Sequence, residues 1–86
     1  MSDQLPQLDF STFVMSIIGS AFVHLGDAPN ESGKAEANLL LADQDIQLLA
    51  LLEEKTKGNL DGEEERVLQR GLHDLRMRYL EVAKEA

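Results

Sequence analysis

Residues 61–82, DGEEERVLQRGLHDLRMRYLEV, decide the fold. Their apolar residues repeat at steps of four and three: Leu68, Leu72, Leu75, Tyr79 and Val82. This is the heptad spacing of a helix that packs along one seam. At the start, the Asp61 side chain can accept a hydrogen bond from a first-turn N–H, and Glu64 can reach back as in a capping box. The stretch therefore predicts a helix over residues 62–84.

A second helix is predicted over residues 39–57, with Asn38 as its N-cap and Gly58-Asn59 as its stop. At 100° per residue, its apolar side chains fill an arc of about 200°, which is wider than one neighbouring helix can cover. Leu40 and Leu51 fall outside even that arc. Because the turn before residue 62 is short, we expect the second and third helices to form an antiparallel hairpin.

The first helix is predicted over residues 10–25, starting near Asp9 or Ser11 and ending at Gly26. It has one continuous apolar face: Phe10, Phe13, Val14, Ile17, Ile18, Ala21, Phe22 and Leu25. A strip of small residues, Ser16, Gly19 and Ser20, predicts a close helix-to-helix contact. The connector over residues 26–37 is longer than the roughly two to eight residues usual between packed helices. The first helix therefore packs on the hairpin or on a neighbouring subunit.

Together these elements predict an all-α fold: a flexible N-terminal segment over residues 1–8, then a single helical domain over residues 9–86. An 86-residue chain buries only about 60–65% of its unfolded surface, so its core is marginal. The apolar residues also exceed what three short helices can cover. We therefore expect a homo-oligomer or a helical protein partner to cover the surplus.

Composition excludes several classes of function. The net charge of −8 disfavours nucleic acid and anionic lipid as partners. Without cysteine, and with only two histidines, the chain offers no evident metal site, and we expect no cofactor. The apolar stretch over residues 10–25 follows acidic residues and is too short to span a bilayer. We expect a cytoplasmic protein. We also expect that it is not an enzyme, because His73 and Asp74 are adjacent on a helix and point about 100° apart, so they do not form a catalytic pair.

Charged residues on the third helix leave two interpretations open. Arg66, Arg70, Asp74 and Arg78 follow one another at four-residue steps. They form either a solvated ladder of ion pairs, with Arg70–Asp74 and Asp74–Arg78 as its rungs, or a docking face for an acidic partner. Arg76 lies beside Tyr79, where its stem can pack while its guanidinium meets an acid.

Several segments resemble a small bacterial family known as domain of unknown function 1844. They are residues 8–14, 23–26, 33–34 and 38–39, and above all the run Glu53-Glu54-Lys55-Thr56-Lys57-Gly58-Asn59-Leu60; residues 63–65 and 75–79 continue the likeness. The sequence departs from the family at Asp61-Gly62 and at Gly71, a position where the family usually has an apolar residue. Both departures predict a looser third helix. The resemblance implies no enzymatic activity. Some members act as accessory factors in complexes that regulate Ras-like polarity GTPases, which implies protein–protein interaction.

The function we expect is therefore a small helical protein–protein interaction or oligomerisation module. The alternatives are an accessory regulatory adaptor for a Ras-like GTPase and a peripheral membrane protein that uses the aromatic face of the first helix. The residues expected to make the interaction are Phe10, Phe13, Ile17, Phe22, Leu51, Arg76 and Tyr79.

Overall fold

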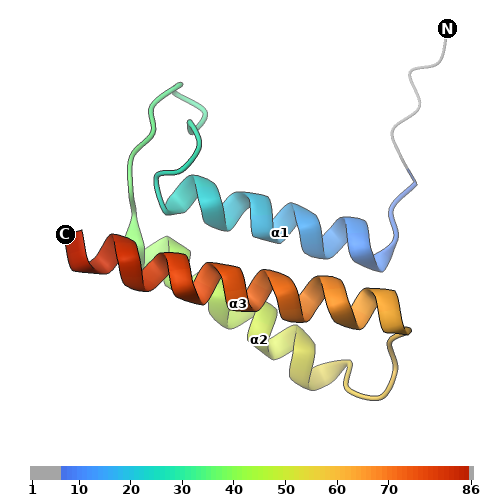
Figure 1. Ribbon diagram of the computed structural model, residues 1–86. Helices are drawn as coiled ribbons and strands as arrows, with labels where there is room; N and C mark the ends of the chain where they lie inside the picture. Colours follow the sequence, from blue (N-terminus) through green and yellow to red (C-terminus); the bar gives the residue numbers. More distant parts are fainter. Residues whose placement is uncertain (1–6, 86) are drawn as a thin grey trace, which may run out of the picture.

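The structure, a computed structural model, describes residues 7–85 and contains three helices. They are α1 (Phe10–His24), α2 (Leu39–Lys55) and α3 (Gly62–Glu85), and each packs against the other two (Figure 1). The predicted all-α, three-helix fold is confirmed, and α1 packs on the other helices of its own chain. The antiparallel arrangement of α2 and α3 stays a prediction. Most of the segment predicted to be flexible, residues 1–6 of 1–8, lies outside the described residues.

Side chains at the three helix starts satisfy backbone N–H groups that have no partner within the helix. Asp9 accepts a hydrogen bond from the Thr12 N–H at 2.8 Å, and this bond lowers the pKa of Asp9. Asn38 caps α2 in the same way. At α3, the Glu64 N–H donates to Asp61 at 2.8 Å and the Asp61 N–H donates to Glu64 at 3.0 Å. The predicted capping box is therefore present.

The ends of α1 and α2 fall one or two residues before the predicted ends. Leu25 follows the last residue of α1 and forms an isolated β-bridge with Ala37. The two ends of the connector therefore lie side by side, and the connector forms the loop seen in Figure 1. Gly26 makes this reversal at φ +88°, where a Cβ would also lie 3.2 Å from the Ala37 nitrogen. The α2 helix ends at Lys55, and the hydroxyl of Thr56, its C-cap, donates a hydrogen bond to the Leu52 carbonyl at 2.7 Å.

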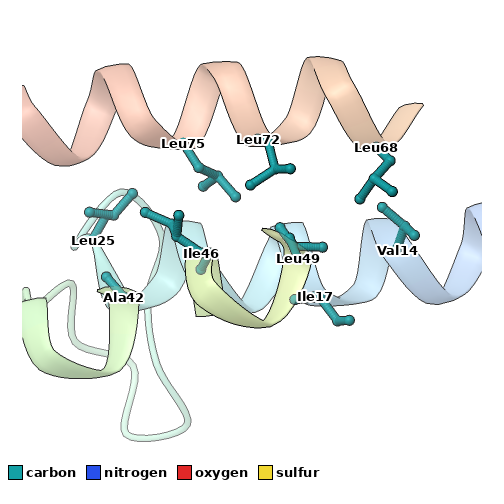
Figure 2. Packing of buried hydrophobic residues seen from close by; sticks show 10 residues of the cluster. Val14, Ile17, Leu25, Ala42, Ile46, Leu49, Leu68, Leu72 and Leu75 are labelled. Carbon is teal, nitrogen blue, oxygen red and sulfur yellow. The ribbon is translucent and has the colours of Figure 1, made fainter. Parts of the chain in front are cut away.

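The core lies between the three helices and is made of aliphatic side chains. Figure 2 shows Leu68, Leu72 and Leu75 pointing from α3 toward α1 and α2. These three leucines are fully buried, whereas Tyr79 and Val82, further along the predicted seam, are partly buried and pack against the core. The core is therefore deepest along the first two-thirds of the seam.

Gly71 is a point of close contact between α3 and α1. A Cβ at this position would lie 2.9 Å from Cγ1 of Ile18 and nearer still to its Cδ1. Gly71 is buried, and its missing side chain makes room for Ile18, a packing role that the prediction of a looser α3 did not include. The small-residue strip of α1 does not have this role, because Ser16, Gly19 and Ser20 are exposed and nothing lies within 4 Å of a Cβ at Gly19.

Candidate interaction surface

Large apolar side chains remain on the surface after the core has formed. Nine of them are at least 40% exposed, and six of these nine belong to α2 and α3: Leu40, Leu41, Leu48, Leu51, Met77 and Leu80. Leu40 is 84% exposed and Leu80 is 60% exposed. Scattered exposed leucines are normal, but a group on two packed helices marks a surface that can be covered by another molecule.

The residues expected to make the interaction divide into two groups. Ile17 is a core residue at 9% exposure, and three others are partly buried and packed against the core: Phe10, Phe22 and Tyr79. The other three are exposed: Phe13, Leu51 and Arg76. The structure thus uses most of the apolar face of α1 to hold the domain together. The exposed members on α2 and α3 are Leu51 and Arg76.

Arg76 borders a shallow hollow between α2 and α3. Its other lining residues are Asp43, Ile46, Tyr79 and Leu80. The predicted position of Arg76 beside Tyr79 is thus observed, but within residues 7–85 its guanidinium makes no ion pair within 4 Å. The predicted contact of its guanidinium with an acid is therefore not made within residues 7–85, and Arg76 is exposed at the surface.

A second hollow lies at the other end of the same pair of helices. Its apolar lining is Ala50, Leu60 and Leu68, and its polar lining comes from both helices and the turn between them: Glu53, Glu54, Thr56, Lys57, Glu65 and Gln69. Part of the family-like run over residues 53–60 therefore forms a wall of this hollow. Both hollows lie between α2 and α3, and we call the side of the helix pair that carries them the outer groove.

Basic residues of α3 collect on the outer side of the helix. Arg66, Arg70 and Arg76 are exposed, as is His73 between them. Arg70 pairs with Asp74 at 3.2 Å, as predicted, and both members are well exposed, so the pair contributes little stability. One rung of the predicted ladder therefore exists, Arg66 and Arg76 have no ion pair within the described residues, and the docking face stays a prediction.

Arg78 points away from this outer side and does not form the predicted rung with Asp74. Its guanidinium donates two hydrogen bonds to Asp27, at 2.7 and 2.8 Å, and a third to Glu81 at 3.2 Å. The hydrogen bonds from Arg78 lower the pKa of Asp27, and the bonds to Asp27 and Glu81 raise the pKa of Arg78. This bidentate pair ties the start of the connector to α3.

A second long-range pair joins α1 to α2. Nδ1 of His24 lies 2.6 Å from a carboxylate oxygen of Asp45, and both side chains are partly buried. The sequence places His24 near the end of the helix predicted over residues 10–25 but does not indicate its partner. The available signal was weak: His24 and Asp45 lie 21 residues apart, on opposite sides of a connector whose path the sequence does not give.

Residues 7–85 contain no group of three or more histidine, cysteine or acidic side chains arranged to hold a metal ion. Nor does any helix in this range have the length and apolar character needed to cross a membrane. The surface of α2 and α3 presents leucine and methionine side chains together with arginines and carboxylates. The fold and this surface define a small all-α protein with an uncovered outer groove.

The chain belongs to the family described as Domain of unknown function (DUF1844), whose model matches residues 7–81. The resemblance stated from the sequence is therefore confirmed over nearly the whole chain. A search of curated proteins and a search of solved structures found no match.

Proposed function

We propose that this chain is a non-enzymatic protein–protein interaction module of the cytoplasm, and that its interaction surface is the outer side of α2 and α3. The observation that carries the proposal is the group of exposed apolar side chains on these two helices, which are themselves firmly packed on the core. Apolar side chains held on a rigid helical surface can bind a partner without a large ordering cost.

Neither alternative function gains a specific observation from residues 7–85. The membrane alternative relied on the aromatic face of the first helix, but Ile17 is buried and Phe10 and Phe22 pack against the core. The GTPase adaptor rests on the family resemblance and involves no particular residue of this chain. The outer side of α2 and α3 is therefore the surface that we assign to the function.

The test compares three forms of the full chain in affinity capture from native cells, together with light scattering of the purified proteins. The wild type is expected to retain a protein, either another chain or a second copy of itself. The variant Leu51→Glu/Leu80→Glu is expected to lose it. The matched control Met15→Glu changes a comparably exposed apolar residue on α1 and is expected to keep it. The proposal is overturned if the double variant and the control retain the same proteins and have the same mass as the wild type.

A further inference from the structure

The outer side of α3 carries a basic strip, although the chain has a net charge of −8. The strip consists of exposed residues at helical spacings of three and four: Arg66, Arg70, His73, Arg76, Met77 and Leu80. Residues three and four apart share one side of a helix, and on this side Arg70 is paired with Asp74, whereas Arg66 and Arg76 have no ion pair among the described residues. The apolar pair at the end of the strip is more than half exposed. The basic strip thus has arginines at its start and middle and apolar side chains near its end.

The outer side of α2 carries a complementary acidic strip. Its members are also exposed and spaced by three and four: Leu40, Asp43, Gln47, Leu51 and Glu54. Gln47 donates a hydrogen bond to Asp43 at 2.6 Å, but neither carboxylate of the strip has an ion pair among the described residues. The acidic strip thus offers two carboxylates with leucines beside them.

The two strips border the same groove. The residues that line each hollow show which positions of α2 and α3 lie at the same height along the helix axes. Asp43 of the acidic strip lines one hollow together with Arg76 and Leu80 of the basic strip. Glu54 lines the other hollow together with Glu65 and Gln69 of α3. Asp43 is therefore level with Arg76, and Glu54 is level with Glu65 and Gln69 near the start of α3.

We infer that a second copy of this chain covers the groove, related by a two-fold axis that runs parallel to the helices. Such an axis places α2 of one copy on α3 of the other. It leaves the height of every residue along the helix axes unchanged. Arg76 of one copy then meets Asp43 of the other, and Leu80 lies near Leu40. Each contact occurs twice because the interface is isologous. This inference rests on the proposed function, because it uses the same surface.

Charge complementarity selects a second copy over other partners. A basic helix would suit the acidic strip but would be repelled by the basic strip, and an acidic helix would have the opposite difficulty. Both strips are satisfied by a partner that presents both signs at matching levels, which the two-fold arrangement provides. The repulsion between two chains of charge −8 acts at longer range, and physiological salt screens it beyond about 8 Å.

The test measures the mass of the full-length protein by light scattering at physiological salt, up to the highest soluble concentration. The wild type is expected to be a dimer. Arg76→Glu and Asp43→Arg each create two like-charge contacts across the interface, so each variant is expected to self-associate at least about tenfold more weakly. Lys34→Glu, which makes the same charge change as Arg76→Glu on the exposed connector, is expected to dimerise like the wild type.

The decisive sample is an equimolar mixture of the Arg76→Glu and Asp43→Arg variants. Within either variant chain, positions 43 and 76 carry the same sign, but every contact between the two different chains joins opposite signs. The mixture is therefore expected to regain the dimer mass, whereas each variant alone remains mostly monomeric. Helical circular dichroism of each variant checks that it is folded.

The inference is overturned if the wild type is a monomer at all concentrations or if the mixture stays monomeric. The proposed function fails separately. A monomeric wild type that still loses a captured protein through Leu51→Glu/Leu80→Glu would contradict the dimer and support the interaction module, because the same surface would then serve a different partner.

Discussion

The apolar faces of α1 and α2 look equally suited to binding when only their sequences are considered, but the folded chain treats them differently. The apolar face of α1 is turned inward, where Val14, Ile17 and Ala21 are buried. The α2 helix also buries three residues, yet Leu40 and Leu51 remain exposed on its outer side. A three-helix domain covers one side of each helix. A helix that is apolar around more than half its circumference is therefore left with a surface that its own chain does not cover.

The same contrast appears on α3, between its inner and outer sides. Leu75 is fully buried, whereas Leu80, five residues later, is 60% exposed. Arg78 is held by Asp27, whereas Arg76, two residues earlier, has no ion pair among residues 7–85. The inner side of α3 is held by contacts within its own chain, whereas the outer side is the surface that we propose binds a partner.

The largest expected effect tests this contrast between two leucines of one helix. Leu75→Ala is expected to lower the free energy of unfolding by about 2–5 kcal/mol, because it leaves a cavity in the core. Leu80→Ala is expected to change it by no more than about 0.5 kcal/mol. Urea denaturation at one low protein concentration compares the two, since association would otherwise add to the stability. Equal losses for both variants would show that the outer side is part of the folding core.

The close approach at Gly71 gives the next largest effect. Gly71→Ala is expected to lower the free energy of unfolding by about 1–3 kcal/mol, although alanine favours helices, because the new methyl group overlaps Ile18. Shortening the opposing side chain should relieve the overlap. Ile18→Val/Gly71→Ala should therefore lose less than the sum of its two single variants, measured as a double-mutant cycle. A stabilised Gly71→Ala variant would show that α1 can move away from α3.

Local sequence patterns were sufficient to predict the helices and most of the core. Heptad spacing in residues 62–84 and the capping box at Asp61 and Glu64 involve neighbours within a few residues, so the sequence displays them directly. The wide apolar arc of residues 39–57 likewise indicated that α2 would have uncovered leucines. Leu41 and Leu48 fell within that arc yet are exposed, because the arc is wider than the side of α2 that α1 and α3 cover.

Contacts between distant segments could not be predicted in this way. Asp27 and Arg78 are 51 residues apart, and only the path of the connector brings them together. Gly71 appeared to be a weak point in α3 because its partner, Ile18, lies on another helix. The site residues expected on α1 could not be distinguished from core residues for the same reason. An apolar helical face has the same sequence pattern whether its own chain or a partner covers it.

The smallest expected effect separates the two arginines, Arg76 and Arg78, by their dependence on pH. Because Arg78 lowers the pKa of Asp27 in the folded state, the pair stabilises the fold at neutral pH. The stabilisation persists down to about pH 4, the ordinary pKa of an aspartate, and is lost as the pH falls through the lower pKa of folded Asp27. Asp27→Asn should therefore be less stable than the wild type at pH 6, and this difference should disappear in acid. Arg76→Gln should match the wild type throughout.

Urea midpoints across this pH range, at a concentration where the chain is monomeric, measure both variants. A pH-independent loss in Asp27→Asn would indicate that the carboxamide disturbs the connector for a reason other than charge. A loss in Arg76→Gln as large as in Asp27→Asn would mean that Arg76 is already engaged within its own chain. That result would remove the distinction between the inner and outer sides of α3, because both arginines would then make stabilising contacts within the monomer.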